Sequence, residues 1–280
     1  MEIRNYLENK LNNLPGRAGV LFEDLITGER VTVVSGQDND IFESASVIKL
    51  WIMSCAYEMY EKGYLDLNKE IEIQNTDMVP GPGFADYRND QLNGVLTEDM
   101  FPESGVLNFL HAGLKLTVHD ILSLMILISD NTATNIMIDL LGMERINEHI
   151  KSLGAGSTLL KRKLFDTDAG ALGLENIFSL NDAADYFRML YEGKLVSEKA
   201  SSEMLAILQN QQNTYKIPFY IRNLPVAHKT GEDSGIENDV GIVFGYHPFI
   251  LCFASNGTDE PAAVRVCQEL AYELEVNNGK

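Results

Sequence analysis

A serine and a lysine stand three positions apart in the stretch FESASVIKLW, as Ser46 and Lys49. On a helix this spacing puts both side chains on one face, with Cβ atoms about 5 to 6 Å apart. A serine hydroxyl is a weak nucleophile at neutral pH and needs a base within hydrogen-bond reach. Lys49 is flanked by Val47, Ile48 and Leu50, and such apolar neighbours disfavour the ammonium form of a lysine. No other serine has a lysine at this spacing, so the pair predicts a nucleophilic serine activated by a neutral lysine amine.

Two further short motifs follow in chain order, Ser129-Asp130-Asn131 and Lys229-Thr230-Gly231. The first interrupts an apolar helical run with residues that favour caps and turns, which predicts a loop. The second is predicted to end a strand, where Gly231 lets the backbone approach a ligand closely. At average residue frequencies the three motifs occur together and in this order in about one chain in a thousand. The combination therefore indicates a catalytic site.

Patterns typical of other catalytic chemistries are missing from the sequence. It contains no G-x-S-x-G serine motif, no H-E-x-x-H zinc motif and no G-x-x-x-x-G-K-[ST] phosphate loop. The five histidines are scattered without the spacing of metal ligands. We therefore expect no metal and no other cofactor.

The bulk composition limits the class of protein and its partners. The chain has 280 residues, 45% of them hydrophobic and 22% charged, which is enough to bury a large core. Its formal net charge of -19 disfavours binding to nucleic acid or to an anionic membrane surface, and we expect a monomer. The most apolar run, Ile121 to Ile128, is too short to cross a bilayer. Cys55, Cys252 and Cys267 lie in apolar segments and are predicted to be buried free thiols.

The N-terminus of the printed chain lacks the continuous apolar core of a secretory signal. We therefore expect a cytoplasmic protein. The alternative is a secreted or periplasmic protein whose export segment precedes Met1 in the gene.

The order of predicted elements indicates an α+β fold. Residues 16–36 are predicted to form a hairpin around a Thr27-Gly28 turn, residues 46–193 are mainly helical, and strands return after Pro218 before a closing helix. The simplest architecture is an antiparallel sheet from both termini with covering helices, formed by residues 1–43 and 213–280. Residues 44–212 are then an inserted all-helical domain. Within them, residues 76–105 are rich in Pro, Gly, Asn and Asp and are predicted to make a long surface excursion.

The three motifs and their surroundings resemble the class A β-lactamases and related penicillin-recognising serine hydrolases over nearly the whole chain. The resemblance implies a β-lactamase/transpeptidase-like fold with the active site between two domains. It also implies a role for each motif residue. These are Ser46 as acylated nucleophile, Lys49 as its base or relay, Ser129 as proton carrier to the leaving nitrogen, Asn131 as ligand of a substrate amide, Lys229, Thr230 and Gly231 around the substrate carboxylate, and the backbone N–H groups of Ser46 and Glu232 as the oxyanion hole.

Two departures from the family pattern concern release and binding of substrate. Class A enzymes carry a glutamate that activates the deacylating water, yet His149 to Leu174 contain none. The carboxylates there are Asp166 and Asp168, which become the alternatives for the deacylation base. Glu175-Asn176 instead resembles a structural element that closes the loop. Near the end of the chain Glu237 stands where many class A enzymes place an arginine, and it would repel a substrate carboxylate unless paired or turned away.

Three functions remain open at this stage. The first is a β-lactamase that hydrolyses the cyclic amide through a Ser46 acyl-enzyme. The second is a D,D-peptidase or esterase-like relative acting on acyl-D-Ala-D-Ala-like substrates, and the third is a penicillin-sensing module that stays acylated. Acylation of Ser46 is common to all three, so the missing glutamate is the feature that separates them.

Overall fold

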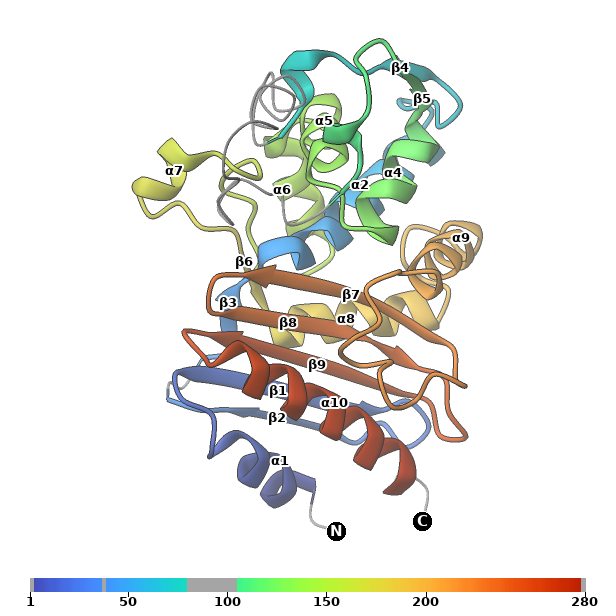
Figure 1. Ribbon diagram of the computed structural model, residues 1–280. Coiled ribbons are helices and arrows are strands. Elements are labelled where there is room, and N and C mark those ends of the chain that lie inside the picture. Colours follow the sequence, from blue (N-terminus) through green and yellow to red (C-terminus); the bar gives the residue numbers. More distant parts are fainter. Residues whose placement is uncertain (1–2, 37–38, 80–104, 278–280) are drawn as a thin grey trace.

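A computed structural model of the chain describes residues 3–36, 39–79 and 105–277. Its centre is a five-stranded antiparallel sheet of order β2-β1-β9-β8-β7, to which both ends of the chain contribute (Figure 1). The strands are β1 (Arg17–Asp24), β2 (Arg30–Val34), β7 (Val226–Asp233), β8 (Ile236–Val243) and β9 (Phe249–Asn256). The predicted α+β class and the sheet built from both termini are confirmed.

The N-terminal hairpin forms where the sequence predicts it. β1 pairs antiparallel with β2, so that Phe22 lies opposite Val31. Asp24 closes the turn because its Oδ1 accepts hydrogen bonds from the backbone N–H groups of Ile26 and Thr27, at 2.7 Å each. The hairpin supplies the outer edge of the sheet, and β7 forms the opposite edge.

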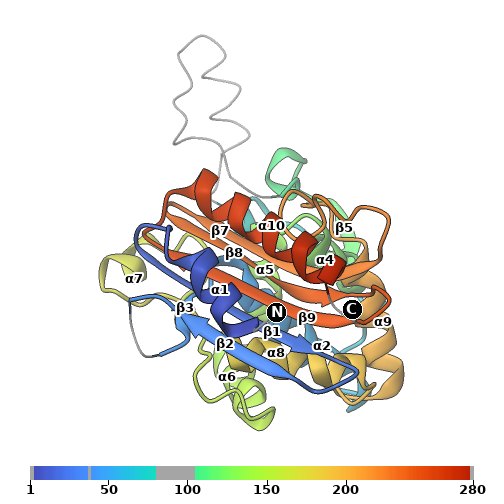
Figure 2. The same ribbon diagram turned by 90° about the horizontal axis from the view of Figure 1, so that it is seen from below.

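Helices cover both faces of the sheet. On one face α1 and α10 lie side by side, and on the other α8 packs against β1, β8 and β9 (Figures 1 and 2). Beyond α8, a cluster of helices stands above the β7 edge (Figure 1). The helices are α1 (Ile3–Leu11), α2 (Lys49–Glu61), α4 (Val118–Leu127), α5 (Asn131–Leu141), α6 (Met143–Ser152), α7 (Thr167–Ala171), α8 (Leu180–Tyr191), α9 (Glu198–Gln209) and α10 (Glu260–Asn277).

Short elements join these layers. They are β3 (Ile41–Glu43), β4 (Glu70–Glu72), β5 (Lys115–Thr117), β6 (Ile177–Ser179) and the 3-10 turns η1 (Ala45–Ile48), η2 (Asn75–Asp77) and η4 (Leu107–Phe109). β3 pairs with β6, and β4 pairs with β5. The β3–β6 pair matters for the site because β3 leads directly into η1 and α2.

The helix α2 lies at the middle of the helical cluster and is buried on nearly all sides. Trp51 is fully buried and stacks edge-on against Tyr186 of α8, whose hydroxyl donates to the Leu50 carbonyl at 2.8 Å. Such close packing leaves little freedom to the backbone that carries Lys49. The three cysteines are buried and free, as predicted. Across the described residues, no helix is both long and apolar enough for a membrane span.

Three predictions from the sequence are not confirmed by the structure. The Lys229-Thr230-Gly231 motif lies inside β7, which continues to Asp233, and not at the end of the strand as predicted. The predicted excursion over 76–105 lies mostly outside the described residues. The division into 1–43 with 213–280 and 44–212 stays a prediction.

Candidate active site

A cleft of about 970 Å³ opens between the β7 edge of the sheet and the helical cluster. Ser46 and Ala45 line it from η1, Asn131 from the start of α5, and Glu232 from β7. The loop from residue 160 to 176 supplies much of the remaining wall. Residues of the first two motifs, and the residue that follows the third, therefore line one concave surface, which ligand sites usually require.

The turn that carries Ser46 is held in an uncommon backbone conformation. Ala45 has a φ of 42°, and Ser129 across the site has a φ of 58°. Non-glycine residues adopt such angles at a cost, and they often mark functional sites. Gly231 of β7 passes so close to η1 that a Cβ there would lie 2.7 Å from the Ser44 carbonyl oxygen. A glycine at this position therefore lets the strand edge approach the nucleophile.

Lys49 reaches into the Ser129-Asp130-Asn131 motif. Its Nζ lies 2.8 Å from the carbonyl oxygen of Ser129, 3.0 Å from Ser129 Oγ and 2.8 Å from Asn131 Oδ1, all within hydrogen-bond distance. Within the described part of the chain, the Ser46 hydroxyl has no hydrogen-bond partner, and the residue as a whole is 6% exposed. The amine thus contacts Ser129 and Asn131. Lys49 follows Ser46 by three positions, and catalytic hydrogen bonds often tighten only when substrate binds.

The predicted loop around Ser129 is confirmed, and Asp130 explains its shape. Asp130 caps α5, because its Oδ1 accepts from the Ala133 N–H at 2.8 Å. Its Oδ2 accepts from the N–H groups of Val106 and Leu107 at 2.7 and 2.9 Å. Asp130 therefore fixes the loop, while Ser129 and Asn131 are left to face Lys49.

Lys229 approaches Ser129 from the other side. Its Nζ donates to Ser129 Oγ at 2.9 Å and to the Thr230 carbonyl oxygen at 2.8 Å. Thr230 is buried, and its Oγ1 accepts from Asn213 Nδ2 at 3.4 Å. The Ser129 hydroxyl thus lies between two lysine amines.

Burial separates the two lysines from ordinary surface lysines. Complete burial, with the nearby Lys229 as the second cause, holds the pKa of Lys49 well below its usual value. Burial also lowers the pKa of Lys229 to about 8, although Glu232 and Asp239 oppose the change. Lys49 is therefore suited to accept a proton, and Lys229 keeps its charge at neutral pH.

A pH profile tests the state of Lys229. If its ammonium group binds a substrate carboxylate, kcat/KM for acylation falls as the pH rises through about 8, because the charge is lost there. An arginine stays charged in this range, so Lys229→Arg is expected to move this alkaline decline to higher pH. The measurement is the acylation rate of wild type and variant between neutral and alkaline pH. An unchanged alkaline decline in the variant would assign it to another group.

Glu237 is neutralised by a lysine that the motifs did not reveal. The Nζ of the fully buried Lys216 lies 2.6 Å from Glu237 Oε2 and 2.9 Å from Glu232 Oε1. Burial opposes its charge, but Glu232 and Glu237 outweigh this effect and raise the pKa of Lys216 above its usual value. Glu237 is thus paired and need not repel a substrate carboxylate. Lys216 interrupts an otherwise apolar stretch, which was the one sequence signal for it.

The loop from residue 160 to 176 is closed by the residues predicted to close it. Arg162 Nη2 donates to Glu175 Oε2 at 2.7 Å. Asn176 Oδ1 accepts from the N–H groups of Lys161 and Arg162 at 2.7 and 3.0 Å. Across the cleft wall, Leu164 exchanges two backbone hydrogen bonds of 2.9 Å with the Asn135 side chain of α5. The base of the loop and its cleft-facing edge are therefore both anchored.

The two aspartates of this loop differ in position. Asp166 lines the cleft, but its Oδ1 accepts from the Ala169 N–H at 3.0 Å and caps α7. Asp168 lies exposed in the first turn of α7 and is not part of the lining. Leu164 and Phe165 also line the cleft, so the loop contributes two apolar side chains to the same lining as Ser46 and Asn131.

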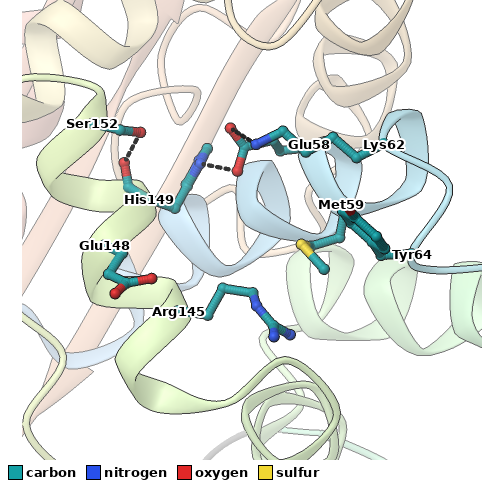
Figure 3. Close-up of a pocket in the computed structure, with 8 residues that line it drawn as sticks. All are labelled: Glu58, Met59, Lys62, Tyr64, Arg145, Glu148, His149 and Ser152. Carbon is teal, nitrogen blue, oxygen red and sulfur yellow. Dashed lines mark hydrogen bonds and ion pairs between the residues drawn. The ribbon is translucent and has the colours of Figure 1, made fainter.

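A second hollow of about 560 Å³ lies between α2 and α6 (Figure 3). His149 is among its lining residues, with Nδ1 3.2 Å from Glu58 Oε2 and Nε2 2.8 Å from Ser54 Oγ. This order of serine, histidine and carboxylate is that of a catalytic triad. Ser54 is fully buried, however, so a substrate has no access to its hydroxyl. Burial lowers the pKa of His149, and the neutral ring joins the two helices.

Comparisons with known proteins agree with this geometry. Beta-lactamase BRO-1 of Moraxella catarrhalis is 22% identical over 253 residues, which cover 87% of this chain and 70% of that protein. The crystal structure of a beta-lactamase from Sphaerobacter thermophilus has a TM-score of 0.79 and 28% identity, covering 96% of this chain and 94% of the other. PBP-A has a TM-score of 0.80 over 99% of this chain and 95% of its own, but at 21% identity this shows the fold alone.

The fold and the residues around Ser46 define a serine hydrolase of the β-lactamase type. The beta-lactamase enzyme family matches residues 2–275, so the chain belongs to that family. The resemblance drawn from the three motifs is thereby confirmed.

Proposed function

We propose that this enzyme opens the amide of β-lactams by acylation of Ser46 and releases the acyl group slowly. The observation that carries the proposal is the position of Ser129, whose Oγ lies 3.0 Å from the Lys49 amine and 2.9 Å from the Lys229 amine. Ser46 lines the same cleft. A nucleophile, a neutral base, a proton carrier and a fixed cation are the groups that acyl transfer from an amide requires.

The acylation step uses these groups in order. The neutral Lys49 amine takes the Ser46 proton as Oγ attacks the lactam carbonyl carbon. The oxyanion is stabilised by the N–H groups of Ser46 and Glu232. The proton passes from Lys49 to Ser129 and on to the lactam nitrogen as the C–N bond breaks. The product is an ester at Ser46, with the ring nitrogen protonated.

Substrate orientation follows from the cations and amides around the nucleophile. Lys229 and Thr230 bind the substrate carboxylate, and Asn131 binds the side-chain amide. A PBP-A variant is known as an acyl-enzyme complex with penicillin G, which supports a β-lactam as acyl donor. No specific contact in the cleft favours a D,D-peptidase over this assignment.

Release of the acyl group is proposed to limit turnover. A general base that activates water typically contributes about 10² to 10⁴ in rate. Of the two predicted bases, Asp166 lines the cleft but is engaged as a helix cap, and Asp168 is outside the lining. Of the two, we assign to Asp166 the weak general-base activity that remains for hydrolysis of the acyl-enzyme.

Labelling with a fluorescent penicillin tests the assignment of Ser46. Wild type is expected to carry a covalent label that survives denaturation, and Ser46→Ala is expected to carry none. Ser44→Ala is the matched control, because Ser44 lies two residues away with its hydroxyl bonded to the Ala45 carbonyl at 3.2 Å. Label that persists in Ser46→Ala would place the nucleophile elsewhere.

A further inference from the structure

The lining of the cleft is strongly acidic, and most of its carboxylates already have partners. Seven acidic residues line it, against Arg162 as the one cation among the lining residues described. Glu175 is paired with Arg162 at 2.7 Å. Glu232 and Glu237 share the buried Lys216 at 2.9 and 2.6 Å. Each of these three carboxylates is therefore already paired with a cation of the protein, Lys216 being shared by two of them.

Three more carboxylates of the lining accept backbone hydrogen bonds. Asp166 accepts from Ala169 N at 3.0 Å, and Asp233 accepts from Ser234 N at 2.8 Å. Glu260 accepts from the N–H of Gly235, also at 2.8 Å. The seventh is Glu43, whose carboxylate has neither a hydrogen bond nor an ion pair to any residue in the described ranges.

Glu43 is held in place although its carboxylate is free. It is the last residue of β3 and pairs with Ile177 of β6. Its N–H donates to Asn256 Oδ1 at 3.2 Å, and its carbonyl oxygen accepts from Asn238 Nδ2 at 3.0 Å. Two asparagines of the central sheet thus fix the backbone from which the side chain enters the cleft. A group fixed in this way is prepared for a ligand before the ligand arrives.

The surroundings of the Glu43 carboxylate favour a positive charge beside it. Burial first, and then the nearby charges of Glu175 and Asp233, raise its pKa, with Arg162 opposing. A nearby cation stabilises the ionised form of a half-buried carboxylate that has other carboxylates around it.

The position of Glu43 relative to the nucleophile identifies which part of a substrate it meets. β7 passes η1 at Gly231, where Lys229 and Thr230 lie on one side and Glu232 and Asp233 on the other. In the proposed function the substrate carboxylate lies at Lys229 and its carbonyl carbon at Ser46. The acyl side chain then extends along β7 toward Asp233, which lines the same cleft as Glu43.

We propose that Glu43 is a specificity-determining residue that selects substrates with a cationic group on the acyl side of the scissile amide. The inference rests on the proposed function, because it takes Ser46 as nucleophile and Lys229 as carboxylate ligand. It goes beyond that function by naming the class of acyl donor. A primary ammonium group near the amide has the charge and the hydrogen-bond donors that the free carboxylate lacks.

Benzylpenicillin and ampicillin form a matched pair of probes, because ampicillin differs by one amino group on the acyl side chain. At about pH 6.5 this group is an ammonium ion, since α-amino groups have pKa values near 8. The measurement is the ratio of acylation kcat/KM values for the two penicillins. We expect wild type to favour ampicillin by about three- to tenfold, the range of a partly exposed charge pair. Glu43→Gln is expected to bring the ratio close to one.

Glu29→Gln is the control variant, because it removes the same charge from the exposed β1–β2 turn, and it is expected to keep the wild-type ratio. Each ratio compares two substrates on one protein sample, so partial misfolding of a variant cancels. Equal ratios in wild type and Glu43→Gln would overturn the role of Glu43 while leaving Ser46 acylation intact. If neither penicillin acylates wild type, the proposed function fails and this inference fails with it.

Discussion

Replacing Lys49 with methionine is expected to slow acylation of Ser46 by about 10³-fold, within the range that general bases contribute. Lys49 is fully buried at the start of α2, and its amine donates to Ser129 and Asn131. Burial and the charge of Lys229 lower its pKa, which makes the neutral amine available near neutral pH. Methionine fills a similar volume without a base.

The rate is measured by rapid mixing with a fluorescent penicillin, followed by quantification of labelled protein over time. Lys69→Met is the control, because Lys69 is exposed and does not line the cleft. A Lys49→Met variant that folds and acylates within about tenfold of wild type would show that another group takes the Ser46 proton.

Introducing a carboxylate at Leu164 is expected to accelerate deacylation, the step that releases the acyl group from Ser46. Leu164 lines the cleft together with Ser46 and Asn131, and its backbone is fixed by two hydrogen bonds of 2.9 Å to Asn135. Leu164→Glu therefore places a partly buried carboxylate beside the acyl-enzyme, where burial favours a pKa suited to a base. Release of the acyl group is expected to accelerate by about 10² or more.

The decay of the penicilloyl adduct, followed after excess penicillin is removed, measures this rate. Leu164→Gln has nearly the same shape as Leu164→Glu and supplies no base, so it is expected to release the acyl group as slowly as wild type. Equal decay in Leu164→Glu and Leu164→Gln would mean that a missing base does not limit release.

The chemistry of the site was largely predictable because it depends on short, local spacing. Lys49 follows Ser46 by three positions, and the Asp130 cap that shapes the Ser129 loop is encoded within the motif itself. The Thr117-x-x-Asp120 capping box likewise marks the start of α4. Local rules of this kind need no knowledge of the rest of the fold.

Contacts between distant segments were not predictable. Lys216 neutralises Glu237 from 21 positions away, and no periodic pattern connects the two. Glu43 stands out because the other carboxylates of the cleft have partners and its own does not. These partners are known only from the folded structure. The predicted end of the strand at Gly231 was wrong, because pairing with β8 continues through this residue. The glycine is explained instead by the close approach of the Ser44 carbonyl oxygen.

The loop between residues 160 and 176 contains both predictable local contacts and unpredictable contacts with a distant segment. Glu175 and Asn176 were predicted to close it, and their contacts with Arg162 and Lys161 do so. Which side chains of the loop face the cleft depends on Asn135, a residue of α5 whose role has no sequence pattern. The sequence therefore identified the loop that lacks a base, but not that Leu164 lines the same cleft as the nucleophile.

The most direct test of the account is intact-protein mass spectrometry of wild type and Ser46→Ala during incubation with benzylpenicillin. Ring opening loses no atoms, so the wild-type adduct is expected to have the mass of the whole antibiotic and to decay slowly once free drug is removed. Peptide mapping should place it on the peptide that contains Ser46, and Ser46→Ala should stay unmodified. An adduct on Ser46→Ala, or no adduct on wild type together with no loss of the antibiotic, would contradict the assignment of Ser46 as the nucleophile.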